Sequence, residues 1–153
     1  MSYYFEKDNV NQYIKMAEGF DGRELINHLK SYLNVGASVL ELGMGPGTDL
    51  EILKETYNVT GSDYSKIFIE LYKKNNPTAN VLVLDARLMH IEGHFDCIYS
   101  NKVLYHLSEE DFLNSINKQY DVLNTGGLLL HSLWFGQGTE ESNGLIFTYY
   151  TMD

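Results

Sequence analysis

Three glycines alternate with other residues in the segment ELGMGPG, residues 41–47: they are Gly43, Gly45 and Gly47. Because glycine has no Cβ, a loop of this kind lets its backbone N–H groups approach a ligand closely. A helix start follows, and its positive end favours a negative group such as a phosphate or a carboxylate. A dinucleotide fingerprint needs G-x-G-x-x-G, and Thr48 stands where its last glycine belongs. The loop therefore predicts a ligand close to its backbone and argues against a nicotinamide dinucleotide.

Polar side chains also stand at the ends of the expected strands. These residues are Glu41, Asp63, Asp85, Ser100 and Asn101. Asp63 comes about 20 residues after the first loop glycine, a spacing at which an acid commonly binds ribose hydroxyls. Its two carboxylate oxygens can accept both hydroxyl protons of a ribose. The pattern predicts an ordered row of polar groups around one crevice.

The elements that must position these groups alternate along the chain. The expected strands span residues 38–42, 59–63, 81–84, 95–100 and 128–133. One helix is expected over residues 48–57, a second from Ser65 to before Pro77, and a third from Ser108 to Gly126-Gly127. This alternation predicts an α/β fold with a Rossmann-like, doubly wound, mostly parallel sheet and helices on both faces. Ligands of such sheets bind outside the carboxyl ends of the strands.

Helical periodicity predicts which side chains turn inward. Asp21 and Glu24 make a capping-box pattern for a helix before the first strand. Tyr32 follows the apolar period of that helix and Tyr120 that of the last helix, so both are expected to face the core. Asp49, in the first turn after the glycine loop, is interpreted as an acid that only stabilises its helix.

Residues 41–47 resemble motif I, E/D-x-G-x-G-x-G, of the class I S-adenosylmethionine-dependent methyltransferases. The resemblance covers roughly residues 21–133 and is nearest to the small-molecule, ubiquinone-biosynthesis-like branch. It implies S-adenosylmethionine as cofactor and S-adenosylhomocysteine as product. Gly43, Gly45 and Gly47 would let the backbone pack against the amino-acid end and ribose of the cofactor. Glu41 would face the methionyl ammonium, or would anchor the loop as a strand-end carboxylate.

The resemblance also implies roles for residues after the second and third strands. Asp63 would bind the ribose hydroxyls, and Tyr64 would lie against the adenine face. Asp85 would accept from the exocyclic amine of adenine, beside a backbone N–H from Ala86 or its neighbour. Two plainer interpretations stay open: Asp63 is a first-turn acid near Ser65, and Asp85 is an exposed turn residue.

After the fourth strand, the resemblance implies that Ser100 and Asn101 hold the methionyl amine, partly through backbone carbonyls. Tyr105 and His106 would border the transferred methyl group. His106 suits a general base because its reference pKa is about 6.5, and a residue that bonds locally and shapes the pocket is an equal alternative. Acceptor contacts lie outside these motifs, so the acceptor is expected to be a small molecule of unknown identity.

Composition limits the other function classes. The formal net charge of -10 and the lack of a Lys/Arg cluster disfavour nucleic acid as a partner. No apolar run approaches the ~20 residues of a membrane span, and the first residues do not resemble a signal peptide. Cys97 is the only cysteine, which fits a cytoplasmic location. His and Cys spacing predicts no metal site.

One domain over residues 1–153 is expected. Residues 1–20, rich in aromatics, would form either a lid over the crevice or an ordinary amphipathic helix. Residues 134–153 are interpreted as a polar loop and an incomplete segment, because the family sheet usually continues with further strands. A shortened form is therefore expected, and its fifth strand would expose an apolar edge that could pair in a homodimer.

Three functions compete at this point. The first is methyl transfer to a small acceptor. The second is a non-catalytic module that binds S-adenosylmethionine or S-adenosylhomocysteine, or an inactive fragment. The third, a nicotinamide-dependent oxidoreductase, is weak because the glycine spacing is wrong and a Tyr-x-x-x-Lys pair is absent from the sequence.

Overall fold

Five parallel strands form the central sheet of the computed structural model, which describes residues 2–152. Their spatial order is β3-β2-β1-β4-β5, with bounds Ser38–Leu42 (β1), Asn58–Asp63 (β2), Val81–Val83 (β3), Phe95–Ser100 (β4) and Leu123–His131 (β5). The strand order changes direction between β1 and β4, so the loops after these two strands diverge and open a crevice. The predicted Rossmann-like α/β fold is confirmed.

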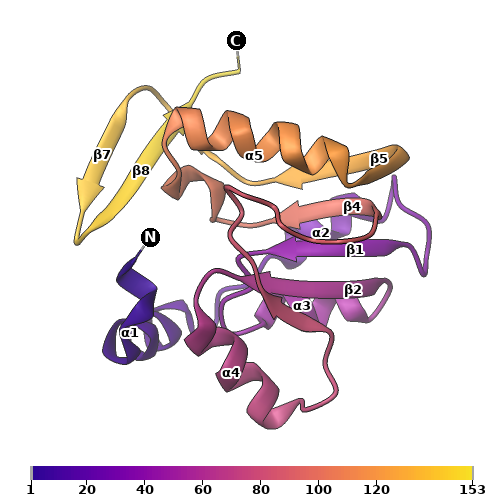
Figure 1. Cartoon of the computed structure of the whole chain (residues 1–153), viewed down its shortest axis with the longest axis horizontal. Coiled ribbons are helices and arrows are strands. Elements are labelled where there is room, and N and C mark those ends of the chain that lie inside the picture. The colour runs from indigo at the N-terminus through magenta and orange to yellow at the C-terminus, as the bar shows by residue number, and fades with distance from the viewer. Residues whose placement is uncertain (1, 153) are drawn as a thin grey trace.

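Helices cover both faces of the sheet (Figure 1). Successive strand residues point to opposite faces. Thus Val39 packs with α2 (Arg23–Leu29), α3 (Thr48–Lys54) and α4 (Lys66–Asn75). Its neighbour Leu40 packs with the 3-10 turn η2 (Leu104–His106) and α5 (Glu109–Asp121). Two apolar cores, one on each side, therefore hold the strand ends in register.

The N-terminal segment lies against the start of α4. This segment, residues 2–21, contains η1 (Ser2–Phe5) and α1 (Lys7–Ala17). The Tyr4 and Tyr13 rings contact the Phe68 ring with centroids 5.6 and 5.8 Å apart. The Ser65 hydroxyl donates a hydrogen bond to the Tyr4 carbonyl at 2.6 Å and accepts one from Phe68 N at 3.4 Å. Ser65 is thus the predicted cap of α4 and also an anchor for the N-terminus.

Several expected helix features are wrong. Gly22, not Asp21, is the N-cap of α2, and the Asp21 carboxylate instead accepts from Arg23 N. Tyr32 is 77% exposed because α2 has already ended at Leu29. Tyr120 is 76% exposed. The neighbouring Gln119 takes the inward position, where its side chain binds the half-buried His131 of β5.

The helix boundaries shift for local reasons. α3 ends at Lys54, three residues before the predicted end, and turns lead from it to β2. α5 ends at Asp121, and Gly126-Gly127 lies inside β5, where the register with β4 shifts. The glycine pair therefore belongs to an irregular strand rather than to a helix end.

Residues 134–150 form a small second sheet where a polar loop was predicted. It contains β6 (Trp134–Phe135), β7 (Thr139–Ser142) and β8 (Leu145–Tyr150) in the order β6-β8-β7. β7 and β8 pair as an antiparallel hairpin through Asn143-Gly144, which both have positive φ, as in a two-residue primed turn. Figure 1 shows the hairpin projecting beside η2 and α5. Thr148 fixes it there by donating a buried hydrogen bond to the Leu107 carbonyl at 2.8 Å.

None of the helices in residues 2–152 is both long enough and apolar enough to cross a membrane.

Candidate functional site

A cavity of about 420 Å³ opens at the carboxyl ends of β1, β2 and β4. This volume lies within the range of roughly 300–1,000 Å³ that small-molecule sites have. One wall comes from the strand ends and the glycine loop, and another from the N-terminal segment. A third comes from η2 and the hairpin, through side chains that include Tyr105, His106, Leu145 and Phe147. The N-terminal segment and the C-terminal hairpin, which are far apart in the sequence, therefore both contribute to the cavity walls.

The three loop glycines have different reasons to be glycine. Their φ angles are +66°, +51° and +92°, a region that side chains disfavour. A Cβ on Gly43 would overlap the Val103 side chain, and one on Gly47 would lie 2.6 Å from the Tyr72 ring. Gly43 and Gly45 line the cavity, whereas Gly47 is not among its lining residues. Close approach of a ligand thus concerns the first two, and Gly47 serves the start of α3.

Asp63 lies at the end of β2 and is 8% exposed. Its Oδ2 accepts the Gly45 N–H and its Oδ1 accepts the Ser65 N–H, both at 2.8 Å. Burial raises the pKa of this carboxyl to about 6, and the two backbone hydrogen bonds oppose the rise. The predicted ribose acid is therefore also a brace of the glycine loop, and each oxygen keeps a lone pair for a ligand.

Glu41 is 3% exposed and lines the cavity beside the glycine loop. Its Oε2 is buried and has no hydrogen-bond partner within the described residues. Burial, with Asp49 and Asp63 nearby, raises the pKa of the Glu41 carboxyl well above its usual value. A buried oxygen without a partner is costly, and a cationic or hydrogen-donating ligand would relieve that cost.

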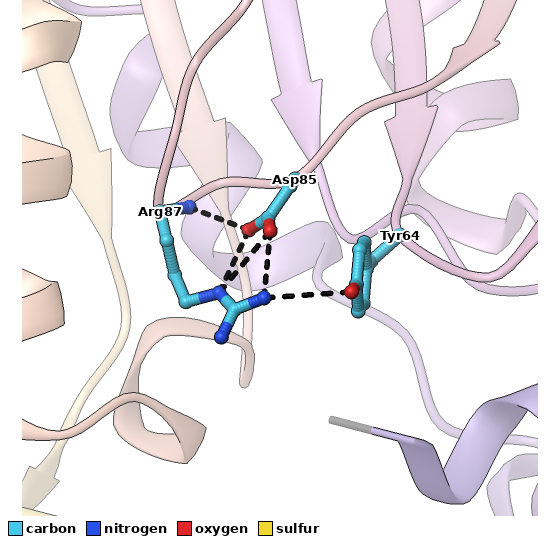
Figure 2. A network of polar contacts seen from close by, with 3 residues as sticks. All are labelled: Tyr64, Asp85 and Arg87. Atoms are coloured by element: carbon cyan, nitrogen blue, oxygen red, sulfur yellow. Dashed lines mark hydrogen bonds and ion pairs between the residues drawn. The ribbon is translucent and has the colours of Figure 1, made fainter.

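Asp85 does not face the cavity, so its predicted contact with adenine is not supported by its position. Both of its carboxylate oxygens accept from the Arg87 guanidinium, at 2.7 to 3.2 Å, and Oδ1 also accepts from Arg87 N (Figure 2). The guanidinium holds the pKa of Asp85 below its usual value, although burial opposes this. Figure 2 also shows Arg87 reaching the Tyr64 hydroxyl at 3.4 Å. Tyr64 and Ala86, predicted with Asp85, do line the cavity.

Ser100 lies at the end of β4 with no exposed surface and is not among the cavity residues. Its hydroxyl is 2.7 Å from His131 Nδ1, and His131 Nε2 is 2.8 Å from Gln119 Oε1. Gln119 donates to the buried Ser115 hydroxyl at 3.0 Å, so Gln119 Oε1 accepts from His131 Nε2–H. His131 Nδ1 then accepts from Ser100. The Ser100 side chain joins β4 to β5 and α5 rather than facing a ligand.

Asn101 lines the cavity as predicted, and it reveals a site residue that the sequence interpretation missed. Its Nδ2 donates to Asp49 Oδ2 at 3.2 Å. Asp49 is 9% exposed, lines the cavity, and also accepts from the Tyr99 hydroxyl and the Gly22 N–H. The interpretation of Asp49 as a simple first-turn acid was therefore wrong. A signal did exist, because Asp49 shares the buried face of α3 with Ile52 and Leu53.

Tyr105 and His106 face the cavity from η2. His106 Nδ1 lies 2.8 Å from the Ile146 carbonyl, which can only accept, so Nδ1 carries the proton. Burial lowers the pKa of His106 below its usual value. The neutral ring then keeps a lone pair on Nε2. Burial raises the pKa of Tyr105, so its hydroxyl stays protonated and can donate a hydrogen bond.

Within residues 2–152, the structure gathers no group of three His, Cys, Asp or Glu side chains that could hold a metal ion.

A doubly wound sheet with a glycine loop and carboxylates at its carboxyl edge defines a small-ligand-binding α/β domain. The chain belongs to the methyltransferase domain family, whose model matches residues 39–127. A curated relative, an uncharacterized 37.1 kDa protein in transposon TN4556 of Streptomyces fradiae, is 33% identical over 103 residues. That match takes in 62% of this chain and 29% of the relative.

Solved structures share the fold. A TehB-like S-adenosylmethionine-dependent methyltransferase from Corynebacterium glutamicum has a TM-score of 0.72 at 21% identity, covering 95% of this chain and all of that one. DesVI of Streptomyces venezuelae has a TM-score of 0.68 at 20% identity, covering 92% of this chain and 67% of its own. CalS10 of Micromonospora echinaspora, an amino pentose methyltransferase solved with S-adenosylmethionine bound, has a TM-score of 0.69 at 18% identity, with 86% and 62% covered. Family and neighbours support S-adenosylmethionine as the cofactor, as the resemblance of residues 41–47 to motif I implied.

Proposed function

We propose that this chain transfers the methyl group of S-adenosylmethionine to a small-molecule acceptor. The observation that carries the proposal is Glu41, a buried carboxylate without a partner on its Oε2, beside a glycine loop at the cavity wall. Membership in the methyltransferase domain family supports the same function.

The residues present fit the cofactor. Glu41 would hold its ammonium group, and the backbone of Gly43 and Gly45 would pack against its amino-acid end. Each Asp63 oxygen accepts one backbone N–H, from Gly45 or Ser65, and its remaining lone pair would accept a ribose hydroxyl. Tyr64 would lie along the adenine. When bound, the cofactor supplies a methyl group activated by its positive sulfur.

The protein's own contribution is alignment, exclusion of water and one proton acceptor. The N-terminal segment and the hairpin close the cavity from two sides. His106 Nε2 would accept a hydrogen bond, or a proton, from the molecule that receives the methyl group. Where that molecule starts protonated, this contributes about 10²–10⁴-fold to the rate. Tyr105 would orient the acceptor by donating from its hydroxyl.

Calorimetric titration tests the binding step. Wild type and Glu41→Gln are titrated with S-adenosylmethionine and S-adenosylhomocysteine, beside Glu92→Gln, the same change at an exposed loop position. Saturable binding that Glu41→Gln weakens at least tenfold, and Glu92→Gln leaves unchanged, supports the proposal. A folded wild-type chain that binds neither compound contradicts it.

A non-catalytic binding module is the second candidate. The chain spans 29% of the curated relative, 62–67% of several structural neighbours and all of the TehB-like methyltransferase. Turnover with any acceptor decides between the two. The screen starts with amines, because neighbours include an amino pentose methyltransferase and a glycopeptide N-methyltransferase, and it adds quinols for the ubiquinone-biosynthesis-like resemblance. That branch and a shortened form stay predictions.

The remaining predictions concern assembly and location. β5 is an edge of the sheet, and Leu129 is 37% exposed on it, so we propose that two copies can pair there. Light scattering of wild type and Leu129→Lys tests the pairing: a dimer that the lysine dissociates supports it. We also propose a cytoplasmic location, because Cys97 is the only cysteine in the sequence and is a buried free thiol.

A further inference from the structure

Gly22, Asp49 and Asn101 come from three distant parts of the sequence and meet at one wall of the cavity. Asp49 Oδ1 accepts the Gly22 N–H at 2.7 Å. Asp49 Oδ2 accepts the Tyr99 hydroxyl at 2.8 Å and Asn101 Nδ2 at 3.2 Å. The carboxylate thus joins the start of α2 to the first turn of α3 and to the end of β4.

The connection continues from Asn101 to the end of β5. Asn101 Oδ1 accepts from the Ser132 hydroxyl at 2.6 Å, and the same hydroxyl accepts the Lys102 N–H at 2.8 Å. Lys102 has a φ of +59°, which a non-glycine residue adopts at a cost unless its surroundings hold it. The turn that follows β4, which carries Lys102 and Val103 into the cavity wall, is therefore fixed by the network that Asp49 begins.

Gly22 fits this network with no room for a side chain. A Cβ there would overlap the Asp49 carboxylate and lie 2.5 Å from the Tyr99 hydroxyl. Gly22 directly follows the N-terminal segment, in which Met16 and Phe20 line the cavity. The hydrogen bond from the Gly22 N–H to Asp49 therefore fixes the C-terminal end of the N-terminal segment at the cavity wall.

The N-terminal segment has its other attachment at Tyr4. The Tyr4 carbonyl accepts from Ser65, and its ring packs on Phe68. Between this point and Gly22, α1 buries only Val10 of its 11 residues, and the Tyr13 ring adds a contact with Phe68. Because so little of the helix is buried, its position depends strongly on how its two ends are held.

We propose that Asp49 is a positioning residue that docks the N-terminal segment, residues 2–21, against the cavity. The inference rests on the proposed function, because the cavity is taken as the S-adenosylmethionine site. A ligand that contacts both the segment and the glycine loop binds the docked form only, so its apparent affinity falls in proportion to the docked fraction.

The test compares Asp49→Asn and Gly22→Ala with wild type and with Asp8→Asn. Asp8 is the matched control, since it is also an acid in the first turn of a helix but is exposed. In Asp49→Asn an NH₂ group replaces one carboxylate oxygen. Either the Gly22 N–H, or the Tyr99 hydroxyl and Asn101 Nδ2 together, then lose their hydrogen-bond acceptor. Hydrogen exchange of the full chain is measured with and without S-adenosylhomocysteine, and affinity is measured by calorimetry.

We expect the amides of α1 and of residues 18–21 to exchange at least tenfold faster in Asp49→Asn and Gly22→Ala, while β1 and β4 keep wild-type rates. Affinity for S-adenosylhomocysteine falls at least tenfold in both variants and is unchanged in Asp8→Asn. Unchanged exchange of α1 in a folded Asp49→Asn overturns the proposal, as does an equal acceleration in β1 and β4, which indicates general destabilisation. If Asp49→Asn does not fold, Gly22→Ala decides by the same criteria. If wild type binds no S-adenosylhomocysteine but α1 still exchanges faster in the variants, the docking role of Asp49 is supported and the proposed function is contradicted.

Discussion

Asp63 Oδ2 accepts the Gly45 N–H at 2.8 Å, so the carboxylate that ends β2 holds the loop that follows β1. Sequence reasoning assigned the loop to the amino-acid end and ribose of the cofactor and Asp63 to the ribose hydroxyls, but it did not predict that the two residues bind each other. In the structure they form one unit, because Asp63 Oδ1 also accepts the Ser65 N–H. A change at Asp63 must therefore alter the loop as well as any direct contact with a ligand.

Asp63→Asn tests this double role. An asparagine has one oxygen and one NH₂ group, so either Gly45 N–H or Ser65 N–H loses its acceptor. We expect the free energy of unfolding to fall by about 1–3 kcal/mol, measured by urea denaturation. S-adenosylhomocysteine should bind more weakly in the same variant. Asp121→Asn, at an exposed site, is the control, and a wild-type denaturation midpoint in Asp63→Asn would show that the carboxylate does not brace the loop.

Two buried groups give opposite pH dependences of stability. Burial lowers the pKa of His131 to about 4, so the unfolded chain takes up a proton that the folded chain resists, and stability is lost as pH falls from about 6.5 to about 4. Burial raises the pKa of Asp63 to about 6, so the folded chain holds the proton more tightly, and stability is lost as pH rises from about 4 to about 6. The raised pKa of Glu41 acts in the same direction as that of Asp63.

Between pH 4 and 6 these contributions oppose each other, and substitutions separate them. Relative to wild type, stability should fall more steeply with rising pH over this range in His131→Asn, and less steeply in Asp63→Asn, which keeps the raised pKa of Glu41. Each difference from wild type corresponds to about 3 kcal/mol over the range, from 1.36 kcal/mol per pKa unit. Denaturation curves at several pH values measure the slopes, with His28→Asn as an exposed control. Parallel curves for the two variants would contradict the assignment.

Ligand binding should release a proton from Glu41. Its carboxyl has a raised pKa without a ligand, and an ammonium beside it would favour the charged form. Calorimetric titration with S-adenosylhomocysteine near pH 6.5, repeated in buffers of different ionisation enthalpy, counts the protons released. We expect wild type to release measurably more protons than Glu41→Gln. Equal proton release in the two proteins would show that the ligand's ammonium group does not lie beside Glu41.

The β1–loop–α3 unit was predictable from the sequence because its determinants are local. An apolar strand, alternating glycines and a helical period lie within a few residues of one another. The same holds for the caps: Ser65 and Ser108 accept from the backbone three residues ahead, as their spacing indicates. The doubly wound topology was predictable because right-handed crossovers leave few possible arrangements.

The site also contains contacts that the sequence did not reveal. Asp85 stands where an adenine-binding acid is expected, and its contact with adenine stays a prediction, but Arg87, two residues later, donates to both of its oxygens. The helical period of α3 places Asp49 on the buried face, but its partners Gly22 and Asn101 are 27 and 52 residues away, so no local pattern identifies them. The hairpin was overlooked although Asn143-Gly144, followed by an apolar stretch, is a strong sequence indication of a primed turn.

The glycines of the loop should respond differently to alanine. Gly47→Ala combines a φ of +92° with a Cβ 2.6 Å from the Tyr72 ring, whereas a Cβ on Gly45 has Tyr13 as its nearest neighbour, at 3.6 Å. We expect Gly47→Ala to lose more than about 2 kcal/mol of stability, and Gly45→Ala about 1–2 kcal/mol. Gly93 has the same φ of +92° and open space, so Gly93→Ala measures the backbone cost alone. Gly45→Ala should in addition weaken S-adenosylhomocysteine binding, and equal stability losses at Gly47 and Gly93 would remove the Tyr72 contact from the explanation.

His106 offers the sharpest test of catalysis. Its Nδ1–H donates to the Ile146 carbonyl and its lowered pKa keeps the ring neutral, so Nε2 is free to accept a proton. His106→Asn keeps a donor near the position of Nδ1 and removes Nε2. Once an acceptor is known, we expect kcat to fall about 10²–10⁴-fold, with S-adenosylhomocysteine affinity within twofold of wild type. The fall of wild-type kcat at acidic pH should disappear in the variant, and His94→Asn, at an exposed position, should behave as wild type. A variant with unchanged kcat would leave His106 the other role that the sequence allowed, a ring that fixes the hairpin and shapes the pocket.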